Sequence, residues 1–225
     1  MARSFLLLLL GIGLGCIAVV YQGWTYLIGW LGLDFVILGV AHMRRSHRVF
    51  GKRADGCLPL WTWAMFLPLQ IYSLVTLNLT RLIGNEPWIS TVNEKLSVGS
   101  RPRGADNCAA FDTVVDLTAE FQETKRVRQR AGYFCFPILD ASAPSAEALI
   151  AALNAMPKGR ILIHCAQGHG RTGLFAAAWL LASGAAATAN EALSILKIAR
   201  PGIELNSLQM RCLSEVELRL KQSPK

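Results

Sequence analysis

The chain has 225 residues, a formal net charge of +8 and a mean hydropathy of +0.35, which is high for a soluble protein. This length limits the chain to one medium-sized domain with some additional elements. The six cysteines form no CxxC pair and there are only four histidines, which argues against a zinc site and against a dense disulfide scaffold.

Apolar residues are concentrated in three runs before residue 80. The runs cover residues 5–22, 24–41 and 58–79, and each is close to the roughly 20 residues that cross a bilayer. We therefore predict a membrane region over residues 1–85, a separate domain over residues 90–225, and an integral protein of the cytoplasmic membrane. One alternative for the first run is a cleaved signal peptide, because Arg3 precedes it.

A basic loop, residues 42–53 (HMRRSHRVFGKR), separates the second run from the third. It carries five of the ten Lys and Arg found through residue 104, a stretch with only four Asp and Glu. The positive-inside rule places such a loop in the cytoplasm against anionic headgroups, whereas nucleic acid is a poor explanation for a basic loop between apolar runs. If the third run then crosses the membrane, the following domain is extracytoplasmic, which is the expected side. Pro59 and Pro68 leave open a buried, surface-lying or re-entrant third run, which would keep the domain inside.

Short apolar strands alternate with helices after residue 90. The expected strands cover residues 95–100, 111–118, 132–139 and 161–164, and the expected helices cover 145–156, 172–183, 189–199 and 205–220. Ser142 and Ser145 are the two candidate caps for the first of these helices, and Pro157 is a stop. This alternation, followed by a helical cluster, predicts an α/β fold with a central sheet flanked by helices.

The stretch ILIHCAQGHGRTG, residues 161–173, carries the clearest chemical signal. A glycine-rich loop leads from the apolar strand before Cys165 into a helix. Gly168 and Gly170 permit a turn that points backbone N–H groups inward, and the helix N-terminus adds its positive dipole end. The predicted phosphate cradle consists of Ala166, Gln167, Gly168, His169, Gly170 and Arg171.

Four side chains at this loop would carry or support the chemistry. The positive field favours the thiolate form of Cys165, which makes it available as a nucleophile. Arg171 offers a planar fork for two phosphate oxygens, and Thr172 can hydrogen-bond the thiolate when it leaves. His164 can order the loop by bonding to its backbone. A buried structural cysteine or an ordinary strand–helix turn would account for single residues, but not for the whole spacing Cys-x5-Arg-Thr-Gly.

The string HCAQGHGRTG resembles the signature of the cysteine-dependent protein tyrosine phosphatase superfamily, in particular its dual-specificity branch. The resemblance extends over residues 93–220 through EKLSVGSRP, FDTVVDLTAEF and ARPGIELNSLQMRCLSE. It implies a phosphatase catalytic domain in which Cys165 forms a phosphocysteine and Arg171 binds phosphate and stabilises the transition state. It also implies that no metal and no other cofactor is needed.

The same resemblance implies an aspartate that acts as general acid upstream of the signature. Asp140, in FPILDASAPS, follows a predicted strand and precedes Cys165 by 25 residues. Its alternative role is to cap a turn or the following helix, and Glu120 and Glu123 are the reserve candidates for the acid. Gln209 is similar to a glutamine that positions water in some branches.

The loop sequence does not separate the substrate classes. Ala166 and Gln167 are uncharged where lipid-directed relatives often carry lysines, and His169 is charged only near or below neutral pH. We predict a membrane-anchored phosphatase that acts on phosphotyrosine or phosphoserine/threonine in proteins. The alternatives are a phosphoinositide or phosphatidylglycerophosphate-like lipid phosphatase of the same chemistry, and an inactive phosphate-binding pseudo-enzyme. The expected partners are a phosphorylated protein or phospholipid and the lipid bilayer, without nucleic acid.

Overall fold

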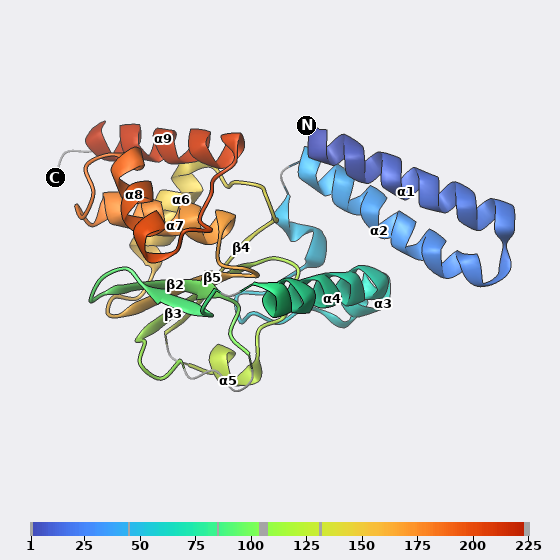
Figure 1. The fold of residues 1–225 in the computed structure, drawn as a ribbon, viewed down its shortest axis with the longest axis horizontal. Helices are drawn as coiled ribbons and strands as arrows, with labels where there is room; N and C mark the ends of the chain where they lie inside the picture. The colour runs from blue at the N-terminus through green and yellow to red at the C-terminus, as the bar shows by residue number, and fades with distance from the viewer. Residues whose placement is uncertain (1, 45, 85, 104–107, 131, 223–225) are drawn as a thin grey trace. The chain divides into compact units, whose positions relative to one another are not determined.

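The computed structural model describes residues 2–44, 46–84, 86–103, 108–130 and 132–222, so Arg45 of the basic loop lies outside the described residues. The chain divides into two compact units (Figure 1). A helical unit contains residues 1–53 and 58–85, and an α/β unit contains residues 54–57 and 86–225.

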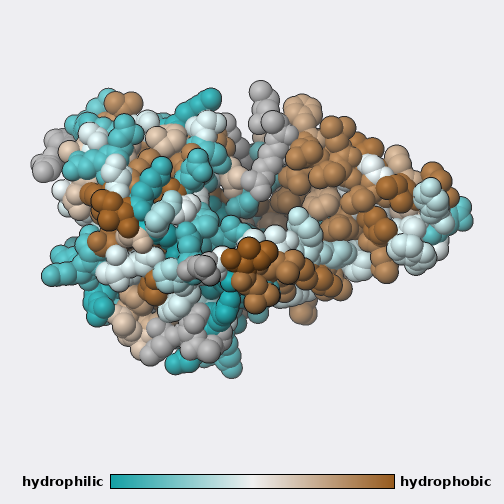
Figure 2. Space-filling model, viewed as in Figure 1, coloured by the Kyte–Doolittle hydropathy of each residue, from teal (hydrophilic) through white to brown (hydrophobic). Residues whose placement is uncertain are grey.

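Two long apolar helices form the first part of the helical unit. They are α1 (Ala2–Tyr21) and α2 (Tyr26–Met43), joined by the 3-10 turn η1 (Gly23–Thr25). The helices run antiparallel and approach closely, because a Cβ at Gly11 would lie only 2.5 Å from the Gly32 carbonyl oxygen. Within the described chain they are the two helices long and apolar enough to cross a membrane, a criterion that a signal sequence or a buried core helix also meets. Figure 2 shows a mainly hydrophobic surface over this hairpin.

The third apolar run, residues 58–79, is not one continuous helix. After the 3-10 turn η2 (His47–Phe50), the chain forms the short helix α3 (Leu60–Met65) and then α4 (Leu67–Ile83). The break falls at Phe66, two residues before Pro68. Proline lacks the N–H that a continuous helix would use at this point, so a break here is the expected consequence of Pro68.

The α/β unit is built on a five-stranded sheet with the order β1-β2-β5-β3-β4. The strands are β1 (Ile89–Thr91), β2 (Leu96–Ser100), β3 (Thr113–Thr118), β4 (Tyr133–Ile138) and β5 (Ile161–Cys165). β1 is antiparallel to β2, and the other neighbouring strands are parallel. The carboxyl ends of the parallel strands therefore meet at one edge, where β5 ends at Cys165.

Helices cover both faces of this sheet unequally (Figure 1). The helices are α5 (Lys125–Arg128), α6 (Ala146–Ala155), α7 (Gly170–Ala182), α8 (Ala189–Ala199) and α9 (Ser207–Gln222). Val115 and Ile163 face the larger core, which includes α6 to α9, whereas Val114 and Leu162 face a smaller cluster. This alternation follows from the two-residue period of strands. The predicted α/β fold is confirmed. Of the two candidate caps, Ser145 is the one that caps α6, by accepting the Ala148 N–H at 3.2 Å.

Candidate active site

The phosphate loop runs from Cys165, the last residue of β5, to Gly170, the first residue of α7. The Cys165 side chain is buried, and its Sγ accepts a hydrogen bond from the Gly168 N–H at 3.2 Å. Gly168 has a φ of +82°, and a Cβ there would collide with the backbone of Gly99 on β2. A side chain at this position would therefore displace the loop from the sheet, which explains why the turn requires glycine.

Arg171 lies in the first turn of α7 with its guanidinium buried. Nη1 and Nη2 donate to the two carboxylate oxygens of Glu120, each at 2.8 Å, and Nη1 also donates to the Ile138 carbonyl at 3.1 Å. Glu120 thus accepts one hydrogen bond from each of the two terminal nitrogens of the guanidinium. The Nε–H and the second N–H of Nη2 form the other edge of the guanidinium, which suits two oxygens of one phosphate.

The electrostatics of Arg171 favour its charged form. Burial alone would lower the pKa of the guanidinium, but the negative charges of Glu120, Cys165 and Asp140 raise it above its ordinary value. Arg171 is therefore a permanent cation beside the buried thiol, and it is held in one orientation before any substrate arrives.

Arg200 braces the outer side of the phosphate loop. Its Nε donates to the Gly168 carbonyl at 3.0 Å and its Nη2 donates to the Gln167 carbonyl at 2.8 Å. These bonds fix the two carbonyls on the Arg200 side of the loop, which holds the loop in the conformation of an anion-binding turn. Glu86 completes the brace, since its Oε2 lies 2.9 Å from Arg200 Nη2 and 2.7 Å from His169 Nε2. Partial burial alone would raise the pKa of the Glu86 carboxyl. The hydrogen bond from His169 and the charge of Arg200 outweigh this effect, so the pKa lies below its ordinary value.

A buried polar cluster lies behind the loop. His164 Nε2 is 3.8 Å from Glu123 Oε2, and together with Asp116 these side chains place one ligand-type atom each within 4.8 Å of one another. Both oxygens of Asp116 are already engaged, because Oδ1 accepts from Thr118 and Oδ2 accepts from the Tyr133 hydroxyl at 2.8 Å. Burial, then the Asp116 charge, raises the pKa of Tyr133 far above its ordinary range, so this phenol stays a donor. Protein donors therefore occupy the oxygens of Asp116, whereas His164 and Glu123 face each other at a distance longer than a hydrogen bond.

Asp140 lies two residues after β4 and reaches the same loop. Its Oδ1 is 3.4 Å from Arg171 Nη2, and its side chain is 58% exposed, so solvent and a leaving group can reach it. The start of α9 fixes the following residues, because Asn206 Nδ2 donates to the Ala141 carbonyl at 2.9 Å and Gln209 Nε2 donates to the Ser142 carbonyl at 3.2 Å. Gln209 also lies close to the end of the phosphate loop, since a Cβ added to Gly170 would be 3.1 Å from Gln209 Oε1.

Thr172 is fully buried in the first turn of α7, and its hydroxyl has no hydrogen-bond partner within the described part of the chain. A buried hydroxyl without a partner is uncommon, because desolvating it costs about 1–3 kcal/mol. The Thr172 hydroxyl can therefore donate a hydrogen bond to a group that forms or binds beside the phosphate loop.

The structure brings Cys165, Arg171 and Asp140 of the predicted site to one end of the sheet. Glu120, a reserve candidate for the general acid, binds Arg171 instead, and Glu123 faces His164 behind the loop. Arg200 belongs to the segment ARPGIELNSLQMRCLSE that resembles the phosphatase family, but no role was predicted for it. The Arg-Pro pair in that segment was the sequence feature that could have pointed to it. Nothing local in the sequence points to Glu86, since its partners lie more than 80 residues away in the chain.

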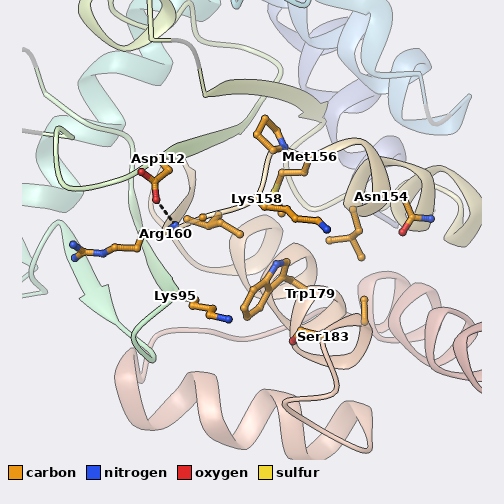
Figure 3. Close-up of a pocket in the computed structure, with 13 residues that line it drawn as sticks. Lys95, Asp112, Asn154, Met156, Lys158, Arg160, Trp179 and Ser183 are labelled. Carbon is orange, nitrogen blue, oxygen red and sulfur yellow. Dashed lines mark hydrogen bonds between the residues drawn. The ribbon is translucent and has the colours of Figure 1, made fainter. Parts of the chain in front are cut away.

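A groove of about 770 Å³ opens at the opposite edge of the sheet (Figure 3). Lys95, Asp112 and Arg160 line it, and they precede β2, β3 and β5. Asp112 Oδ2 accepts the Arg160 N–H at 2.7 Å, and Trp179 forms part of the wall. The groove contains none of the phosphate-loop residues and is not the candidate active site.

Comparison with protein families identifies the class. Residues 105–219 match the model of the dual specificity phosphatase catalytic domain, so the chain belongs to this family. It is a phosphoric monoester hydrolase with the cysteine-based fold of that family, as the sequence signature predicted.

Solved structures of phosphatases are similar to this chain. A mutant form of Tk-PTP is 28% identical, with a TM-score of 0.52, over 61% of this chain and 99% of that chain. Human DUSP28 is 23% identical, with a TM-score of 0.52, over 60% of this chain and 97% of that chain. PTPMT1 in complex with PI(5)P is 17% identical, with a TM-score of 0.52, over 60% of this chain and 98% of that chain. The last two establish a shared fold only, and no curated protein matches the sequence.

Proposed function

We propose that the chain hydrolyses phosphate monoesters through a covalent phosphocysteine at Cys165. One observation carries this proposal: the buried Cys165 Sγ accepts a hydrogen bond from the Gly168 N–H, and the pre-oriented cation of Arg171 lies in the first turn of α7, directly after the same loop. Donors fixed before substrate binds need no reorganisation during the reaction, which is the main source of electrostatic catalysis.

The proposed reaction has two steps. In the first, the Cys165 thiolate attacks phosphorus, the bond from phosphorus to the leaving oxygen breaks, and the Asp140 carboxyl gives its proton to that oxygen. In the second, water attacks phosphorus and loses a proton to the Asp140 carboxylate. The S–P bond then breaks, its electron pair returns to sulfur, and inorganic phosphate leaves.

The other site residues stabilise these two steps. Arg171 and the N–H groups of residues 166–170 hold the three peripheral phosphate oxygens as negative charge accumulates on them. The hydroxyl of Thr172 donates to the sulfur when the thiolate leaves, which gives its unpartnered donor a use. His164 keeps the start of the loop in place against Glu123.

We propose phosphorylated proteins as the substrate class and the cytoplasmic membrane as the location. The similarity to Tk-PTP at 28% identity supports a protein tyrosine phosphatase type of activity, and the apolar helices α1 and α2 support a membrane anchor. A phospholipid substrate is the second candidate, because an anchored domain meets headgroups at a high effective concentration.

A side-by-side assay separates the two substrate classes. The detergent-solubilised full chain is given phosphotyrosine and phosphothreonine peptides, and separately mixed micelles that contain phosphoinositides or phosphatidylglycerophosphate. We expect the higher kcat/KM on peptides. A preference for the phospholipids would assign the chain to the second candidate, and no release of phosphate from any of them would leave only a phosphate-binding role.

We expect Glu120→Ala to lower kcat/KM by about 10- to 100-fold, because a loosened Arg171 no longer meets the phosphate in the required geometry. Glu120 contacts the guanidinium and not the leaving group, so the loss should be the same for good and poor leaving groups. Glu94→Ala, which removes an exposed carboxylate elsewhere, is the matched control. A loss confined to poor leaving groups would show instead that Glu120 supplies the proton.

A further inference from the structure

Both ends of the third apolar run lead into the same compact unit. Residues 54–57, which precede the run, and residues 86 onward, which follow it, belong to the α/β unit. The Gly56 carbonyl accepts the Glu123 N–H at 3.3 Å, and Cys57 Sγ accepts from Arg128 Nη1 at 2.6 Å. At Gly56 the φ is +76° and a Cβ would collide with the Tyr133 hydroxyl, so the segment fits this site closely. At the other end, Glu86 pairs with His169 and Arg200.

These two attachments restrict how residues 58–85 meet a bilayer. A single crossing would place its two ends on opposite sides of a hydrocarbon core about 30 Å thick. One compact unit cannot hold both ends in that case. Two crossings would need about 40 apolar residues, which is more than this segment contains. The segment therefore enters and leaves the membrane on the same side.

The break at Phe66 has the features of a turn inside a membrane. A broken helix leaves backbone groups without partners, which is costly in lipid unless neighbouring helices supply them. Here α2 supplies one donor and one acceptor to the backbone beside the break. Trp30 Nε1 donates to the Met65 carbonyl at 2.7 Å, and Asp34 Oδ2 accepts the Leu69 N–H at 3.2 Å. These two partners lie one helical turn apart on α2, on either side of the break.

The depth of the break agrees with a re-entrant path. Asp34 lies nine residues before the end of α2 at Met43, which is about 13 Å along a helix. The six residues of α3 rise about 9 Å, and the non-helical Leu58 and Pro59 add up to about 7 Å, so this stretch reaches a comparable depth. Several apolar side chains on this segment are exposed, among them Leu60 at 87% and Ile83 at 83%. Lipid is the environment that would cover them.

We infer that α3 and α4 form a re-entrant hairpin, and that the catalytic unit faces the cytoplasm together with the basic loop. The inference rests on the proposed membrane anchor. The basic loop continues directly into residues 54–57 of the catalytic unit, so both lie on one side, and its Arg48, Lys52 and Arg53 place that side in the cytoplasm. With α1 and α2 as the two crossings, the N-terminus is cytoplasmic too. This reverses the outward orientation that three crossings would give.

The orientation agrees with the chemistry of the site. A reducing compartment keeps the Cys165 thiol available as a nucleophile. The proposed substrates are therefore cytoplasmic phosphoproteins or headgroups of the cytoplasmic leaflet.

Reporter fusions and cysteine labelling of the full chain in a bacterial inner membrane test this topology. After Lys225, a fluorescent protein that matures only in the cytoplasm should fluoresce and alkaline phosphatase should be inactive. A membrane-impermeant maleimide should label Trp24→Cys in intact spheroplasts and Arg53→Cys only after permeabilisation, with the unsubstituted chain as background. Active alkaline phosphatase after Lys225, or labelling of Arg53→Cys in intact spheroplasts, would overturn the inference. Aryl phosphatase activity of the same proteins in detergent reports the proposed chemistry independently of topology.

The role of α2 at the break is tested by two substitutions of similar size. Asp34→Leu removes the acceptor for the Leu69 N–H and should lower the midpoint of thermal unfolding in detergent by an amount on the order of 4 °C. Asp34→Asn keeps an acceptor oxygen and should stay near the native midpoint. Equal midpoints for the two variants would show that Asp34 does not hold the hairpin.

Discussion

The Cys165→Ser protein is expected to lose about 10⁴-fold or more of its phosphatase activity while it still binds phosphate. A serine hydroxyl at this position remains protonated and is a poor nucleophile, whereas the N–H groups of the loop and Arg171 are unchanged. Single-turnover and steady-state rates on an aryl phosphate measure the loss, and inorganic phosphate competition or calorimetry measures the remaining binding. Appreciable turnover by Cys165→Ser would exclude the proposed nucleophile.

Cys212→Ser provides the matched control. Cys212 is also buried, and burial raises the pKa of its thiol to about 11. Its Sγ donates to the Pro144 carbonyl at 3.3 Å, a bond that a serine hydroxyl can keep. This variant should retain nearly native activity, so a comparable loss in both variants would indicate a defect of folding and not of chemistry.

The Asp140→Asn protein should turn over esters with poor leaving groups about 10²–10⁴-fold more slowly than the native protein. The amide keeps the shape of the side chain but cannot give a proton to the leaving oxygen. An activated aryl phosphate needs little protonation, so its rate of phosphocysteine formation should fall much less. The measurement is the first-step rate across a series of leaving groups, plotted against the pKa of each leaving group.

Asp112→Asn is the control for this second substitution. Asp112 lies at the opposite edge of the sheet, where its carboxylate accepts the Arg160 N–H (Figure 3). Its replacement should leave the dependence on the leaving group unchanged. Equal losses for activated and poor leaving groups in Asp140→Asn would assign Asp140 a structural role and place the acid elsewhere.

The sequence predicted most elements of the catalytic unit because local signals specify them. Helix α8 has the predicted bounds Ala189–Ala199, and the signature places Cys165 at the end of a strand and Arg171 at the start of a helix. The strand β1 (Ile89–Thr91) was missed, since three residues are too few to show a periodic pattern.

The supports of the site could not be predicted in the same way, because they join residues far apart in the chain. Glu120 and Arg171 are 51 residues apart, and Glu86 and His169 are 83 residues apart. The path of the third apolar run also depends on distant partners, since Trp30 and Asp34 hydrogen-bond the backbone groups on either side of the break near Phe66. Apolar length alone predicted a crossing there and gave no information on where the flanking residues bind.

Trapping the covalent intermediate tests the central claim most directly. The full-length protein in detergent is mixed with an activated aryl phosphate, quenched in acid after milliseconds, digested and analysed by mass spectrometry. We predict a phosphate group on the peptide that contains Cys165. It should accumulate further in Asp140→Asn, because the second step lacks its base, and it should be absent from Cys165→Ser. Turnover accompanied by phosphate on a different residue, or by no phosphorylated peptide in any quench, would contradict the proposed mechanism.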